Sequence, residues 1–109
     1  MNVDVRHGGR WEPAVDSDPD RLFGVLENPR ARTILSAMDD TPVTASELAD
    51  RCGIPNSTMY RQLGELVDAG LVRKSVRLDR SGHHASEFSR AVSDISISLD
   101  EAGLCVDLY

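Results

Sequence analysis

The chain contains little of what small proteins use to compensate for a modest core. Its 109 residues include two cysteines, one tryptophan, two tyrosines and two phenylalanines. Two cysteines far apart in the sequence do not form a disulfide framework. No apolar run approaches the about 18 residues of a membrane-spanning helix, and the chain begins without a signal-like segment. We therefore expect one small cytoplasmic domain without membrane contact, whose core a second subunit would help to cover.

The patterns that carry catalysis are missing as well. There is no nucleophile with a motif-placed base, no glycine-rich phosphate loop and no cysteine-rich metal box. His83 and His84 are adjacent, but neighbouring strand residues point to opposite sides, and no cysteine or carboxylate pattern accompanies them. We expect no enzymatic activity, no cofactor and no metal, and the sequence does not identify an effector.

Lysine is nearly absent too. Eleven of the twelve basic residues are arginine, twelve of the eighteen acidic residues are aspartate, and the net charge is −6. This bias resembles proteins of extreme halophiles, whose cytosol is concentrated salt. Acidity argues against nucleic-acid binding, but residues 54–92 hold six basic and four acidic residues, which leaves +2 there and −8 elsewhere. Two functions stay open: a DNA-binding regulator, or an acidic protein-interaction module that does not bind DNA specifically.

What the sequence does contain is a pair of short helices around a tight turn. Thr44 and Glu47 have the spacing of a capping box, and Gly53 suits the left-handed residue that ends a helix. Pro55 is suited to open a second helix, expected over about 55–69. Four apolar residues of that helix share one face: Met59, Leu63, Leu66 and Val67.

The opposite face of this second helix is rich in hydrogen-bonding side chains. Arg61 lies opposite the apolar stripe, and Tyr60 and Gln62 flank the stripe where they can reach outward. Such donors and acceptors read base edges in a major groove, whereas an ordinary solvated face is usually rich in Glu and Lys. The predicted base-reading residues are Asn56, Ser57, Thr58, Tyr60, Arg61 and Gln62.

A family resemblance is carried by the run SELADRCGIPNSTMYRQLGELVDAGLV. From Leu26 to about Val92 the chain resembles ArsR-type winged helix-turn-helix repressors, with kinship to MarR-like regulators. The resemblance implies a homodimeric regulator of double-stranded DNA, with its recognition positions on the six residues named above. Metal-sensing members carry a cysteine-rich box on the helix before the turn. That helix has only Cys52 here, so metal sensing at that site is not supported.

The predicted fold is therefore α+β: a winged helix-turn-helix of about four helices and a wing hairpin over residues 18–92. Two starts, Asp18-Pro19 and Asn28-Pro29, predict the helices before the turn. The wing is expected over about 71–92, with Arg77, Arg80 and His83 on the DNA backbone or in the minor groove. Residues 1–17 show no periodicity and are predicted to be a flexible arm.

The last segment, 93–109, departs from the helical ending common in ArsR-type proteins. Two strictly alternating apolar sets flank an Asp-Glu-Ala-Gly turn: Ile95, Ile97 and Leu99, then Leu104, Val106 and Leu108. We predict a C-terminal β-hairpin that supports the wing or joins two subunits, with the first helix as the competing dimer surface.

Overall fold

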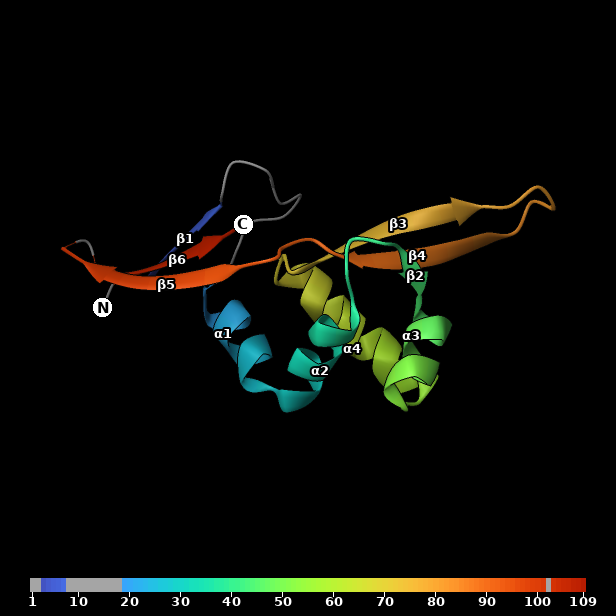
Figure 1. Ribbon diagram of the computed structural model, residues 1–109, viewed down its shortest axis with the longest axis horizontal. Coiled ribbons are helices and arrows are strands. Elements are labelled where there is room, and N and C mark those ends of the chain that lie inside the picture. Colours follow the sequence, from blue (N-terminus) through green and yellow to red (C-terminus); the bar gives the residue numbers. More distant parts are fainter. Residues whose placement is uncertain (1–2, 8–18, 102) are drawn as a thin grey trace.

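The computed structural model describes residues 3–7, 19–101 and 103–109. Four helices lie between two three-stranded sheets in this part of the chain (Figure 1). The elements in order are β1 (Val3–His7), α1 (Pro19–Glu27), α2 (Pro29–Ala37), β2 (Val43–Thr44), α3 (Ala45–Cys52), α4 (Asn56–Asp68), β3 (Val72–Leu78), β4 (His84–Arg90), β5 (Ile95–Asp100) and β6 (Gly103–Leu108). The predicted α+β winged helix-turn-helix with an additional C-terminal hairpin is confirmed.

Helix starts follow the local signals in the sequence. The Asn28 side chain accepts a hydrogen bond from the backbone N–H of Arg30 at 3.0 Å, with Pro29 opening α2. The Thr44 hydroxyl accepts from the Glu47 N–H at 3.2 Å, and the Glu47 carboxylate accepts from the Thr44 N–H at 3.3 Å. The predicted capping box of α3 is therefore present.

Three arginines contact the carboxyl ends of helices, and one of them, Arg51, donates from Nη1 to the Ala37 carbonyl at 3.5 Å, where α2 ends. Arg32 donates from Nη1 to the carbonyls of Leu26 and Glu27, at 2.7 and 2.9 Å, where α1 ends. Arg90 donates from Nη1 to the Leu35 carbonyl at 3.4 Å, near the end of α2. The last carbonyls of a helix have no partner within it and carry partial negative charge, so guanidinium groups suit them. Part of the positive charge of the chain thus binds helix ends of the same domain.

The core is formed where the helices meet the bases of both sheets. Its fully buried large side chains are Leu22, Ile34, Leu48, Met59, Leu63, Leu66, Leu71, Val106 and Leu108. Val106 and Leu108 come from β6, so the C-terminal hairpin contributes to the same core as the helix-turn-helix. The hairpin is therefore an integral part of the domain.

The wing sheet has the order β2-β4-β3, and its outer half extends beyond the helices (Figure 1). β3 pairs antiparallel with β4 from Val72 opposite Arg90 to Leu78 opposite His84. Val72 is buried, whereas Val76 and Leu78 are 58% and 77% exposed. These three residues share one face of β3, and that face is covered only at its base, because the hairpin extends beyond the helices that support it.

The second sheet, which we call the tail sheet, has the order β1-β6-β5. β5 and β6 form the predicted hairpin, with Ile97 opposite Val106 and Leu99 opposite Leu104. β1 pairs parallel with β6 in the register Val3 with Leu104 to His7 with Leu108. Residues 3–7 are thus a strand, and the prediction of a flexible arm was wrong for them. The partner of this strand lies at the other end of the chain, and a five-residue strand carries too little local pattern to reveal it. The rest of the predicted arm, including Trp11, lies outside the described residues.

Candidate nucleic-acid interface

The turn between α3 and α4 sets the direction of the second helix. Gly53 adopts φ +66° at the end of α3, a left-handed conformation that few other residues adopt. Its N–H donates to the Asp50 carbonyl at 3.4 Å, and the Ile54 N–H donates to the Ala49 carbonyl at 3.0 Å. Pro55 then stands at the N-cap of α4, one residue before the position predicted for it. Two helices joined by so short a turn form a helix-turn-helix.

α4 buries one face and leaves the beginning of the other open. Met59, Leu63 and Leu66 are fully buried against the helices of the core. The solvent-facing residues of its first three turns are Asn56, Ser57, Tyr60, Arg61, Gly64 and Glu65, with Thr58 half-buried beside them. No acidic residue lies in the first turn. Five of the six predicted base-reading residues therefore share one accessible region.

Gln62 does not belong to that region. Its side chain is 4% exposed, and its Oε1 accepts a hydrogen bond from Nδ2 of Asn28 at 3.2 Å. Position 62 is only about 60° from Met59 around the helix, and the start of α2 covers that side. The expectation that Gln62 reaches outward was wrong. Because Asn28 also caps α2, this pair links the N-terminus of α2 to the middle of α4.

Arg77, predicted to contact the DNA backbone, lies in a cluster of acidic side chains. Its Nε and Nη2 donate to Oε2 of Glu87 at 2.9 and 2.6 Å, and its Nη1 lies 3.6 Å from Oε1 of Glu47. The hydrogen bonds and charge of Glu87, followed by Glu47, raise the pKa of Arg77. Glu47 belongs to the capping box of α3, so this cluster connects the wing to the first helix of the helix-turn-helix. Sequence reasoning did not identify this role.

The wing tip is a structured turn. Oδ1 of Asp79 accepts from the N–H and the hydroxyl of Ser81, at 2.7 and 2.8 Å, and these bonds lower the pKa of Asp79. Gly82 has φ +84°, and its N–H donates to the Asp79 carbonyl at 3.1 Å. Nδ1 of His83 lies 2.9 Å from the Ser81 hydroxyl. Arg80 is exposed at the same turn. This turn ends the wing hairpin, and Arg80 and His83 both belong to it.

A groove of about 260 Å³ runs between α4 and the wing. Its lining includes Tyr60 and Gly64 from α4 and Lys74 and Phe88 from the wing strands. Gly64 has no atom within 4 Å of where a Cβ would stand, so the helix leaves open space here. Lys74, the single lysine of the chain, was absent from the predicted site. Side chains alternate along a strand, so Lys74 shares a face of β3 with Val72 and Val76. The buried Val72 on this face was the signal that Lys74 lies on the side of α4.

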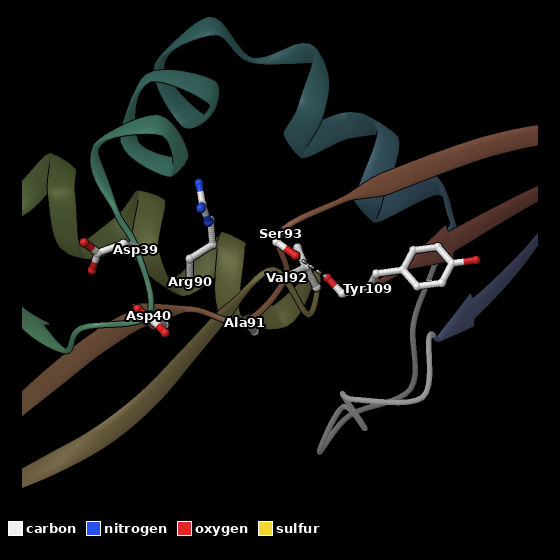
Figure 2. A pocket seen from close by; sticks show the side chains of 7 residues that line it. All are labelled: Asp39, Asp40, Arg90, Ala91, Val92, Ser93 and Tyr109. Carbon is white, nitrogen blue, oxygen red and sulfur yellow. Dashed lines mark hydrogen bonds between the residues drawn. The ribbon is translucent and has the colours of Figure 1, made fainter.

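A second hollow of about 370 Å³ lies beside the segment that joins β4 to β5, and it is lined by residues 90–93, Asp39, Asp40 and Tyr109. Its polar side chains do not converge on one point (Figure 2): the Arg90 guanidinium points away from the carboxylates of Asp39 and Asp40, and the Tyr109 ring points outward. Arg90 instead contacts the end of α2, as described above. We assign no ligand to this hollow.

Two further features are absent from the part of the chain that the structure describes. No group of three or more His, Cys, Asp or Glu side chains is placed there to hold a metal ion. None of its helices combines the length and the apolar content needed to span a bilayer.

The helix-turn-helix is also recognised by comparison with known proteins. A family model described as a helix-turn-helix domain matches residues 26–75, from the end of α1 to the first half of β3. A search of curated proteins found no match to the chain. The family match covers α2, α3 and α4 completely and stops before the wing tip and the tail sheet.

Proposed function

We propose that this protein is a sequence-specific, DNA-binding transcriptional regulator that acts as a homodimer. In this proposal α4 enters the major groove of double-stranded DNA as the recognition helix, and the wing contacts the neighbouring backbone or minor groove. The observation that carries the proposal is the exposed face of α4 within a domain that matches the helix-turn-helix family. In helix-turn-helix proteins the N-terminal residues of the second helix contact base edges.

Within α4 we assign base contacts to the accessible side chains alone. Arg61 is the strongest candidate, because an arginine that binds guanine O6 and N7 with two hydrogen bonds discriminates well between bases. Asn56, Ser57, Thr58 and Tyr60 complete the set, and Gln62 is left out because it is buried. Lys74 joins as a contact to the DNA backbone, since it lines the groove beside Tyr60, between the helix and the wing that both contact DNA in this proposal.

The wing contributes through Arg80 and His83 at its tip. Both are exposed, and no ion pair within the described residues holds Arg80. Arg77 is a weaker candidate for phosphate, because Glu87 and Glu47 already neutralise it. Its proposed role is to hold the wing at a fixed angle to α3.

Three finer properties complete the proposal. The resemblance carried by residues 26–92 supports kinship with ArsR-type repressors. The predominance of arginine over lysine and of aspartate over glutamate supports work in a cytoplasm of concentrated salt. The two-fold sites that helix-turn-helix dimers bind support a homodimer, and a DNA-binding role requires no catalytic activity.

The alternative is an acidic winged-helix module that binds proteins. It is favoured by the net charge of −6 and by Glu65 and Asp68, which lie on the later turns of α4. Both functions use the same surface, but they differ in salt dependence and in sequence preference. Binding to genomic DNA fragments across a wide salt range separates them, because only a regulator selects particular fragments.

The decisive variant is Arg61→Ala. We expect it to lose about 1–3 kcal/mol of discrimination between its preferred fragment and unrelated DNA, with the thermal unfolding midpoint unchanged. Arg30→Ala is the matched control, because it removes the same charge from an exposed position on α2. Equal loss in both variants would mean that Arg61 acts only through its charge. No preference for any fragment in the wild-type protein would favour the protein-binding alternative.

A further inference from the structure

The tail sheet ends in an edge strand without the usual protection. β5 is an outer strand in the order β1-β6-β5, and its residues 95–99, Ile-Ser-Ile-Ser-Leu, contain no charged residue and no proline. Its single charged residue, Asp100, is the last one before the hairpin turn. Exposed sheet edges are normally protected by charges, because their open backbone groups pair with other strands. The outer strand of the wing, β3, carries Arg73, Lys74 and Arg77, and the other outer strand of the tail sheet, β1, includes Asp4 and Arg6.

The backbone groups that face this edge can be identified. Asp94 and Tyr109 exchange two backbone hydrogen bonds, at 3.0 and 3.4 Å, and so form a hydrogen-bonded pair of the antiparallel ladder. Such pairs alternate with pairs that are not bonded to each other. The N–H and C=O groups of Ile95, Ile97 and Leu99 therefore point away from β6, toward the edge.

The same three residues become more exposed toward the tip of the hairpin. Ile95 packs against the core, Ile97 is 56% exposed, and Leu99 is 77% exposed. Both the open backbone groups and the uncovered apolar side chains thus belong to one strand. A partner for this surface must itself supply an extended strand with an apolar side.

We propose that this partner is β5 of a second copy, paired antiparallel edge to edge, so that the two tail sheets form one six-stranded sheet. Antiparallel pairing inverts the second strand and brings its exposed tip beside the covered base of the first. The interface closes on itself under two-fold symmetry, which is the commonest arrangement of homodimers. It uses both open β5 edges and leaves β1, with its charged residues, on the outside.

We place the centre of the pairing at Ser96, because charge disfavours the neighbouring register centred on Ile97. Pairing centred on Ile97 would place Asp94 directly opposite Asp100 of the second copy, and like charges in that position destabilise a sheet. Pairing centred on Ser96 instead pairs Ile95 with Ile97 and sets Asp94 opposite Ser98. Ser96 then meets its own copy at a pair without mutual hydrogen bonds, where Cα atoms are about 4.5 Å apart. This inference rests on the homodimer of the proposed function and specifies how that dimer forms.

The first test compares lysine substitutions on two exposed hairpin strands. Ile97→Lys should convert the full-length protein from dimer to monomer in light scattering. Val76→Lys is the matched control, because Val76 is 58% exposed on the outer strand of the wing, and this variant should remain dimeric. A monomeric wild-type protein, or a dimeric Ile97→Lys protein, would overturn the proposal.

The second test reports the register directly. With Cys52 replaced by serine and Cys105 by alanine, so that no other thiol remains, Ser96→Cys should form a disulfide-linked dimer under mild oxidation. A separation of about 4.5 Å between Cα atoms permits the bond. Ser75→Cys, an exposed serine on the outer strand of the wing, should stay monomeric on a denaturing gel. Absence of the link in Ser96→Cys would overturn the register centred on Ser96.

DNA binding is measured separately on the same proteins. If the wild-type protein shows no fragment selectivity while the Ser96→Cys variant cross-links as expected, the proposed function fails and the β5 interface stands. Selective binding by a protein whose Ile97→Lys variant stays dimeric would instead support DNA recognition and reject the β5 interface. We expect Ile97→Lys to bind the preferred fragment at least tenfold more weakly, because each monomer then holds only one half-site.

Discussion

The two hairpins of this protein, the wing and the tail, have similar length but opposite chemistry. They extend from the helices in opposite directions (Figure 1), and each exposes a leucine to 77% near its tip, Leu78 in the wing and Leu99 in the tail. Residues 71–92 contain five basic and two acidic residues, whereas residues 93–109 contain four acidic residues and no basic residue. One hairpin suits a polyanion, and the other repels one. A protein with a net charge of −6 can bind DNA only if its acidic residues lie away from the surface that contacts the DNA.

The hairpins also differ in how they join the core. The wing is attached at its base, where Val72 and Phe88 are buried, and through the cluster of Arg77, Glu87 and Glu47. The tail places Val106 and Leu108 inside the core itself. Both hairpins therefore supply side chains to the core, and the wing has the ion pairs of Arg77 as an additional attachment.

The largest effect should come from the tail. Leu108→Ala is expected to lower the free energy of unfolding by about 2–5 kcal/mol, because it leaves a cavity at a fully buried site. Leu78→Ala in the wing should change it by no more than about 0.5 kcal/mol, as for other exposed positions. Chemical denaturation of the two variants measures both values. Similar losses would mean that Leu78 is covered in the folded protein, contrary to its 77% exposure.

A smaller effect separates the arginines within the wing. Arg80→Ala should reduce the salt dependence of DNA binding by about 0.9 in the logarithmic slope, which is the loss of one phosphate contact. Arg77→Ala should change the slope less, because Glu87 and Glu47 hold this side chain. Binding isotherms at several salt concentrations measure both slopes. A larger change for Arg77 would place it on the DNA and contradict its role as a wing brace.

The smallest expected effect concerns the wing turn and pH. The pKa of Asp79 is lowered by its hydrogen bonds to Ser81, so its folded-state pKa lies below its unfolded value. Its contribution to stability is therefore present above the ordinary pKa and is lost as pH falls through the lowered folded-state value. Wild type and Asp79→Ala should differ in melting temperature at neutral pH and converge in strong acid. A difference that stays constant down to strong acid would assign the effect to something other than this carboxylate.

Much of the helix-turn-helix followed from neighbouring residues. The capping box of Thr44 and Glu47 and the left-handed Gly53 were both predicted, because each depends on contacts within a few positions along the chain. The alternating apolar residues of the tail likewise predicted β5 and β6. Among the predicted site residues, Arg61 and its neighbours are accessible as expected, since helical periodicity decides which side faces the core.

The predictions that failed depended on partners distant in sequence. Gln62 is buried because Asn28, 34 positions earlier, covers that side of α4. Residues 3–7 are a strand because β6, at the other end of the chain, offers them an open edge. Arg77 is neutralised by Glu87 in β4 and by Glu47 in α3, a combination that no local pattern contains.

The sequence by itself determined the elements of this protein: where α3 and α4 begin and end, which face of α4 is apolar, and where two hairpins turn. Those features depend on backbone conformation and on periodicity, which neighbouring residues set. Only the tertiary structure decided which polar side chains stay available for a partner. Availability depends on what covers a residue from elsewhere in the chain, and this is why Arg61 remains accessible, Gln62 is buried and Arg77 is held by two carboxylates.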